Sequence, residues 1–176
     1  MVRGSNTLKI ALVGIMAASL ECVKLALAAL PNIEAVTLLI GLYSYVFGIY
    51  GVLAALIFVM IEPLIWGFGS WVISYLIYWP ALGIIFALLG KLLVKNRFTI
   101  TAIGVLMTFL FGVLTSLVDV GLFSGSFDNF LYRFGIYYAR GIVFYAVQIG
   151  CNAVLLFLLF PFFARHLSAL RRRMRI

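Results

Sequence analysis

Long apolar segments constrain this chain more than any other feature of its sequence. A soluble domain averages about 45–50% apolar and about 25% charged residues, whereas this chain of 176 residues is 66% apolar and 10% charged. A membrane-spanning helix needs about 20 apolar residues, and segments of this kind follow one another over nearly the whole sequence. The composition therefore predicts an all-α, polytopic membrane protein with no room for a soluble nucleotide-binding or catalytic domain.

Six membrane-spanning helices are expected, and they form a single membrane domain over residues 1–176. The expected ranges are Leu8–Leu30, Ile33–Phe47, Gly51–Trp66, Trp71–Leu93, Phe98–Leu122 and Arg133–Phe163. The second and third helices could instead be one helix of about 50 Å at 1.5 Å per residue. That length exceeds a hydrocarbon core of about 30 Å. We therefore expect a turn at Gly48-Ile49-Tyr50-Gly51, where two glycines permit a tight reversal.

The basic residues support an even number of spans and predict the orientation. With six helices, ten of the thirteen basic residues fall on one side of the membrane: Arg3, Lys9, Lys91, Lys95, Arg97, Arg165, Arg171, Arg172, Arg173 and Arg175. Lys and Arg are enriched in cytoplasmic loops, so both termini are expected in the cytoplasm. Because the net charge of +8 is concentrated at this edge, nucleic-acid binding is not expected.

Polar side chains within the predicted spans gather in the other half of the membrane. Charged side chains are costly in hydrocarbon, so each one is a candidate functional residue. A small-molecule site combines apolar walls with a few polar groups, and the residues at this level predict a pocket of that kind, open to the outside. The candidate binding residues are Asn32, Glu34, Glu62, Trp66, Tyr75, Trp79, Asp119, Tyr137, Arg140 and Gln148.

Structural roles for these charges are open alternatives. Glu21 and Lys24 stand three residues apart and could neutralise each other on one helix. Asp119 and Arg140 could form an interhelical ion pair. Glu62 could extend to the water at the membrane surface. If the charges do face a pocket, the surplus of carboxylates favours a neutral or cationic ring as ligand over a multiply charged anion.

Catalysis is not expected from this chain, and neither is a bound metal. The only histidine, His166, lies in the basic C-terminal tail, so a Ser–His or Cys–His pair and a histidine metal site cannot form within the membrane. The sequence also has no glycine-rich phosphate loop.

Small residues mark one face of the first expected helix, at Ala11, Gly14 and Ala18. A small-xxx-small spacing lets another helix approach closely, either within the bundle or from a partner protein.

Several short motifs resemble the substrate-specific S component of energy-coupling factor (ECF) vitamin transporters. They are the Ala/Gly-rich segment 11–18, Leu30-Pro31-Asn32-Ile33-Glu34-Ala35-Val36-Thr37, and Val46-Phe47-Gly48 followed by Gly51. The resemblance implies a six-helix bundle that captures a vitamin from outside the cell. It also implies three protein partners, a transmembrane coupling protein and two cytoplasmic ATPases. The ATPases would use ATP, while this chain holds no cofactor. The family's Ala-xxx-Ala motif contacts the coupling protein; Gly14 stands at its first alanine and Ala18 matches the second.

The substrate is not determined by the resemblance, because members of the family bind different vitamins. Aromatic walls with surplus carboxylates favour a pyridoxine-like or hydroxymethylpyrimidine-like ligand. Pantothenate is the better candidate if Arg140 and Lys24 both face the pocket. The expected location is the plasma membrane of a prokaryote, in contact with membrane lipid. A non-transporting membrane scaffold or assembly subunit is the alternative class, and in it the charges would be buried ion pairs.

Overall fold

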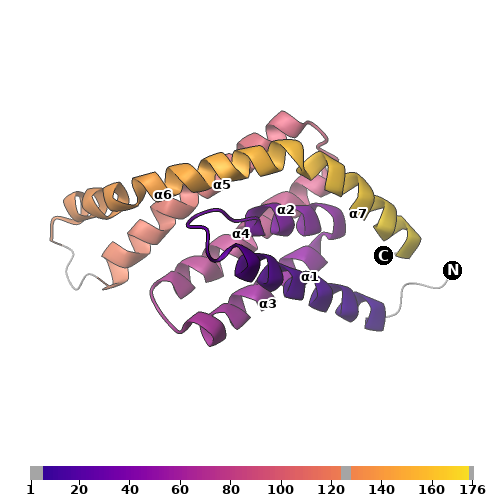
Figure 1. The fold of residues 1–176 in the computed structure, drawn as a ribbon, viewed down its shortest axis with the longest axis horizontal. Helices are drawn as coiled ribbons and strands as arrows, with labels where there is room; N and C mark the ends of the chain where they lie inside the picture. The colour runs from indigo at the N-terminus through magenta and orange to yellow at the C-terminus, as the bar shows by residue number, and fades with distance from the viewer. Residues whose placement is uncertain (1–5, 124–127, 175–176) are drawn as a thin grey trace.

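All regular structure in the computed structural model is helical over the residues that it describes, which are 6–123 and 128–174 (Figure 1). Arg3 and Arg175, used in the topology prediction, lie outside these ranges. A π-helical turn, η1 (Asp119–Phe123), extends α5. The α-helices are α1 (Asn6–Leu27), α2 (Val36–Phe47), α3 (Ile49–Trp66), α4 (Trp71–Lys91), α5 (Arg97–Val118), α6 (Phe130–Leu158) and α7 (Phe160–Met174).

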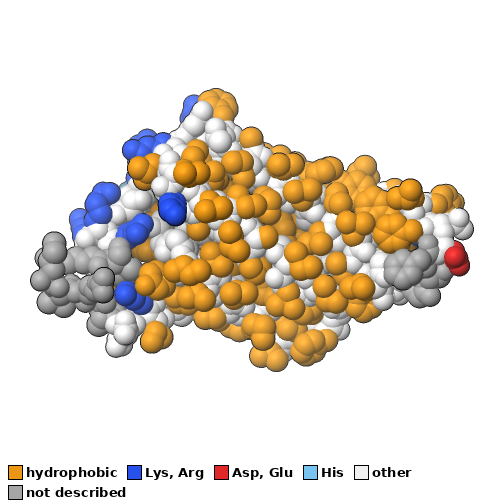
Figure 2. Space-filling model, turned by 180° about the vertical axis from the view of Figure 1, so that it is seen from behind, with side chains coloured by type: hydrophobic (Ala, Val, Ile, Leu, Met, Phe, Trp, Pro, Cys, Tyr) orange, Lys and Arg blue, Asp and Glu red, His pale blue; other side chains and the backbone are white. Residues whose placement is uncertain are grey.

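Five of the helices in the described ranges are long and apolar enough to cross a membrane: α1, α3, α4, α5 with η1, and α6. Many large apolar side chains are exposed, and they cover the broad middle of the face seen in Figure 2. The chain is therefore all-helical and has the character of a multi-pass membrane protein. The sixth apolar helix, α2, has 12 residues and is about 18 Å long at 1.5 Å per residue. It is shorter than a hydrocarbon core of about 30 Å.

The short helix α2 occupies the middle of the bundle. It packs mainly against α4 and α3, and α7, α1, α6 and α5 also contact it. Nine of its twelve residues are buried, with Ile40 and Leu42 at most 1% exposed, and the other three are half-buried. A helix that is apolar on all sides is stable only when other elements surround it. The hydrophobic core is therefore built around α2.

Gly48 makes the turn between α2 and α3, and it is the only residue between them. Its φ of +62° and ψ of −125° lie in a region that is open mainly to glycine. Gly51 has a different role, because a Cβ atom there would lie 2.3 Å from the backbone nitrogen of Ser44. The predicted break at residues 48–51 is confirmed. One glycine makes the reversal, and the other allows the two helices to touch.

The connection between α1 and α2 is longer than expected. The first helix was predicted to reach Leu30 and the second to begin at Ile33, but α1 ends at Leu27 and α2 begins at Val36. Asn32 takes a left-handed conformation with φ of 59°. The Glu34 carboxylate accepts a hydrogen bond from the Thr37 backbone N–H at 2.9 Å, which satisfies a free donor at the start of α2. Residues 28–35 therefore form a loop.

The last expected helix, Arg133–Phe163, is wrong at both ends. α6 begins at Phe130 and ends at Leu158, and the residues beyond it form a separate helix, α7, instead of a tail. Pro161 stands in the first turn of α7, where a missing N–H costs nothing, but it cannot continue α6. The other helix ends lie within four residues of the prediction, and three of them, Phe47, Trp66 and Trp71, coincide with it. α5 passes into η1 near its predicted end.

The start of α1 and the whole of α7 share one end of the molecule (Figure 1). At this end Arg171 of α7 donates a hydrogen bond to the Val46 carbonyl at 2.6 Å. This carbonyl is in the last turn of α2, where a cation is favoured. The Tyr45 hydroxyl donates to the Val94 carbonyl, in the connection between α4 and α5, at 2.8 Å. Lys and Arg side chains gather here (Figure 2). We call it the basic end, defined by Lys9, Lys91, Lys95, Arg97, Arg165, Arg171, Arg172 and Arg173.

Candidate functional site

Two adjoining cavities lie between α1, the α1–α2 connection, α3 and α4, at the end of these helices away from the basic end. Their volumes are about 250 Å³ and about 330 Å³. Both are lined by Lys24, Ala28 and Tyr75, so we treat them as one site, the α1–α4 site. The other residues that line it are Leu27, Leu30, Pro31, Asn32, Ile33, Glu34, Val36, Glu62, Trp66, Trp71, Trp79, Phe111 and Gln148.

An ion pair between Lys24 and Glu62 forms the charged centre of the α1–α4 site. The Glu62 side chain is completely buried and the Lys24 side chain is 25% exposed. The alternative in which Glu62 extends to surface water is therefore wrong. The pairing also differs from the one considered for Glu21, which is buried and has no hydrogen-bond partner for either carboxylate oxygen in the described chain.

Aromatic rings surround the Lys24 ammonium group. Its nitrogen lies 5.0 to 6.0 Å from the ring centres of four residues: Phe58, Trp66, Trp71 and Tyr75. A cation at this distance is attracted to the negative face of an aromatic ring. The aromatic rings thus exclude water from the Lys24 ammonium group and also stabilise its charge.

A second polar cluster holds the loop side of the site. The Glu34 carboxylate accepts hydrogen bonds from the Thr37 hydroxyl at 2.6 Å and from the Asn152 amide nitrogen at 2.7 Å. Asn152 also donates to the Thr108 hydroxyl at 3.1 Å. These contacts join the α1–α2 connection to α2, α5 and α6. Glu34 therefore serves both as a wall of the cavity and as an anchor for the loop above it.

One wall of the site has an unused hydrogen-bond donor. Trp79 is 3% exposed and lines the cavity, but its indole nitrogen has no hydrogen-bond partner in the described residues. Tyr75 packs edge-on against Trp79, with ring centres 5.6 Å apart. A buried donor without an acceptor is costly. A bound molecule with an acceptor oxygen or nitrogen would remove this cost.

Seven of the ten predicted binding residues line the α1–α4 site: Asn32, Glu34, Glu62, Trp66, Tyr75, Trp79 and Gln148. Asp119, Tyr137 and Arg140 do not. Asp119 lies in η1, and Tyr137 and Arg140 are exposed on α6, where the guanidinium group is 6.0 Å from the Tyr137 ring centre. Within the described residues, Asp119 and Arg140 form no ion pair with each other, so that alternative is wrong.

The lining residues that were not among the predicted ones are Lys24, Leu27, Ala28, Leu30, Pro31, Ile33, Val36, Trp71 and Phe111. Lys24 was considered as a partner of Glu21 and, in the pantothenate alternative, as a pocket residue, but it was not among the predicted binding residues. The sequence did contain a signal, because Lys24 is a charged residue within a predicted span and falls in the same half of the membrane as the residues that were selected. Ala28, Leu30 and Ile33 were not selected because they are apolar and were expected to be helical.

The small-residue face of α1 points away from the bundle. Ala11, Gly14 and Ala18 are all exposed, and a Cβ atom built on Gly14 would have no neighbour within 4 Å among the described residues. Packing within the bundle therefore does not explain this face.

Comparison with protein-family models, with curated proteins and with solved structures found no match. The search for groups of three or more His, Cys, Asp or Glu side chains that could hold a metal also found none in the described ranges. The site itself offers a paired cation, hydrogen-bonding groups and aromatic rings in edge-on and tilted contact. These features suit reversible binding of a small polar ring compound.

Proposed function

We propose that this chain is the substrate-binding S component of an ECF-type, ATP-driven micronutrient importer. In this proposal α1 to α6 are six spans, both termini are cytoplasmic, and the α1–α4 site captures a water-soluble vitamin or precursor outside a prokaryotic plasma membrane. A coupling protein and two cytoplasmic ATPases then drive its delivery inward. The main support is that seven residues, selected from the sequence by side-chain type and depth, line one pair of adjoining cavities opposite the basic end.

The charges in the site support a neutral or cationic heterocycle as substrate. Lys24 is balanced by Glu62, which leaves Glu34 as the remaining charged group of the lining. Arg140, which a pantothenate site would have needed, is exposed on α6. Aromatic side chains and the free Trp79 donor suit a flat ring with acceptor atoms. A pyridoxine-like or hydroxymethylpyrimidine-like molecule is therefore our first candidate, and pantothenate the second.

A non-transporting membrane scaffold is the competing function. The observation in its favour is that the charged groups already satisfy one another: Lys24 pairs with Glu62, and Glu34 binds Thr37 and Asn152. Such pairs stabilise packing without any ligand. A scaffold of this kind predicts no saturable binding of a small molecule.

Mass spectrometry of the purified protein separates the two functions. The protein is isolated in mild detergent and denatured, and any released small molecule is identified and quantified. The importer proposal predicts a vitamin or precursor in near-stoichiometric amount, or thermal stabilisation by one member of a panel of B-group vitamins. An empty extract together with no stabilisation by any of these vitamins would contradict it and favour the scaffold.

A further inference from the structure

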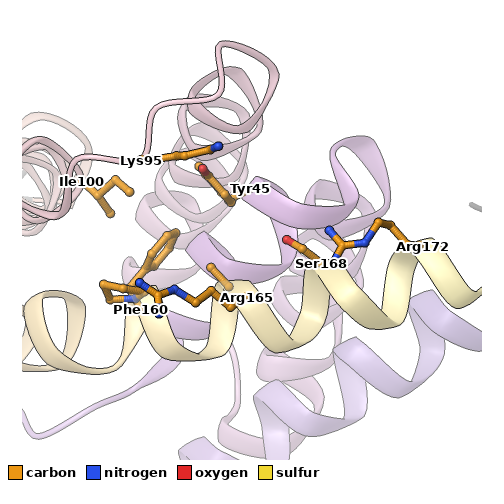
Figure 3. A pocket seen from close by; sticks show the side chains of 9 residues that line it. Tyr45, Lys95, Ile100, Phe160, Arg165, Ser168 and Arg172 are labelled. Atoms are coloured by element: carbon orange, nitrogen blue, oxygen red, sulfur yellow. The ribbon is translucent and has the colours of Figure 1, made fainter.

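A third cavity, of about 340 Å³, lies at the basic end, on the opposite side of the molecule from the α1–α4 site. It is bounded by α7, the last turns of α2 and the start of α5 (Figure 3). Three cations line it: Lys95 from the α4–α5 connection, and Arg165 and Arg172 from α7. Ile100, Phe160 and Pro161 form its apolar part. The cavity thus joins positive charge and apolar surface.

Among the residues that the structure describes, no acidic side chain neighbours the three cations of this cavity. The chain contains five acidic residues in total. Glu21, Glu34 and Glu62 belong to the other side of the bundle, and Asp119 and Asp128 stand near the junction of α5 and α6, which lies at the end opposite α7 (Figure 1). Arg171 is not one of the three cavity cations, and its guanidinium group donates a hydrogen bond to the Val46 carbonyl. Positive charge is therefore available here for an outside anion.

The position of the cavity matches the edge of a membrane. Apolar side chains cover the broad middle of the surface and stop where Lys and Arg begin (Figure 2). α7 is itself amphipathic, with Phe162 56% and Phe163 40% exposed and arginines in its last turn. Helices of this composition lie in the interface between lipid headgroups and acyl chains. Arg165 and Arg172 are thus placed at headgroup level.

We propose that this cavity binds the phosphate group of an anionic phospholipid. The planar guanidinium groups of Arg165 and Arg172 suit two-point contact with phosphate oxygens, and Lys95 adds a third positive charge from across the cavity (Figure 3). Basic pockets between helices at a membrane surface bind lipid headgroups in this way. The apolar part of the lining, with Ile100 and Phe160, suits the apolar atoms that follow the phosphate in a phospholipid.

Native mass spectrometry of the full chain in detergent tests the proposal, with phosphatidylglycerol and phosphatidylcholine titrated separately. We expect phosphatidylglycerol to bind at least about tenfold more tightly than phosphatidylcholine. Each basic residue near an anionic group contributes roughly fivefold in affinity. The variant K95Q/R165Q/R172Q should therefore lose roughly hundredfold in affinity for phosphatidylglycerol. The single variant Lys95→Gln, in an exposed connection, should lose about fivefold and leaves the helices unchanged.

The matched control is K9Q/K91Q/R173Q, which removes the same charge from the basic end without touching the cavity lining. It should keep most of the affinity. Equal binding of the two lipids, or an equal loss in the control and the cavity variant, would overturn the proposal. An additional arm includes millimolar inorganic phosphate. If free phosphate displaces the lipid completely, the cavity is a site for soluble phosphate, and the lipid assignment is wrong.

Discussion

Lys24 and Glu62 depend on each other at the centre of the α1–α4 site. Glu62 is fully buried and Lys24 is largely enclosed by aromatic rings. A charge in such surroundings is costly without a partner of opposite sign. Together the two residues provide a polar centre to an apolar cavity. Either one alone would be an uncompensated charge within a membrane bundle.

Removing only one partner of this pair should therefore destabilise the protein. We expect Glu62→Gln to lower the free energy of unfolding by about 1–3 kcal/mol, measured by thermal unfolding in detergent. The double variant Lys24→Met/Glu62→Gln should recover most of that loss, because neither charge remains. A double variant that is less stable than Glu62→Gln would show that the pair does not carry the effect.

Gln148 offers a direct test of the α1–α4 site as a binding site. It is 7% exposed and lines the cavity from α6. Leucine at this position keeps a similar volume but removes the amide. If the bound vitamin uses that amide, Gln148→Leu should weaken its binding about tenfold, as measured by isothermal titration calorimetry. Arg140→Gln, on the exposed part of α6, serves as the control and should bind the vitamin normally. Weaker binding by Arg140→Gln together with normal binding by Gln148→Leu would place the site at Arg140 instead.

The depth of a residue was predictable from the sequence, whereas its direction was not. Counting residues at 1.5 Å per residue gives the level of each side chain along a helix. This was sufficient to select Glu62, Trp79 and Gln148. The face of α6 that meets the bundle could not be predicted, because the apolar side chains of this helix are distributed around its whole circumference. For that reason Tyr137 and Arg140 were assigned to the site although they point elsewhere.

Helix ends were predictable where length or glycine imposed them. The turn at Gly48 followed from the excessive length of a single helix. The early start of the loop after Leu27 could not be predicted in this way. It depends on contacts of Glu34 with Thr37 and with Asn152, and Asn152 is 118 residues away in the sequence. α7 was missed because its arginines were interpreted as an orienting tail. Its apolar residues at helical spacing were the signal.

Gly48 should tolerate no side chain. The positive φ angle makes Gly48→Ala strained, and we expect a loss of about 1–3 kcal/mol in the free energy of unfolding, visible as a lower midpoint in thermal unfolding. Gly14→Ala is the control, since it adds the same methyl group within a helix at a position with open space. It should be neutral or stabilising by up to about 1 kcal/mol. Equal losses in both variants would contradict the role assigned to Gly48.

At the scale of the whole molecule, three candidate functional surfaces are separated in space. The α1–α4 site lies on one side of the bundle, the basic end on the other, and the small-residue face of α1 is directed outward between them. A binding subunit that works with a separate coupling protein needs this kind of separation. One surface would hold the substrate while another contacts the partner.

The outward face of α1 should carry the contact with the coupling protein if the proposed function is correct. Gly14→Leu with Ala18→Leu adds bulk where the described residues leave open space. We expect the protein to bind its vitamin normally but to lose co-purification with the coupling protein and ATPases. Ala102→Leu, at an exposed position of α5, is the control and should assemble normally. Assembly of the double α1 variant with its partners would exclude this face as the interface.

The single-residue turn between α2 and α3 has a consequence for biogenesis. With 12 residues, α2 is too short to be a good insertion signal by itself, since a stable span needs about 20 apolar residues. Gly48 provides no polar linker that would let the two helices enter the bilayer one after the other. The translocation machinery must therefore accept residues 36–66 as one helical hairpin. Because α3 and α4 are the main neighbours of α2, the centre of the protein can assemble while α5 and α6 are still being synthesised.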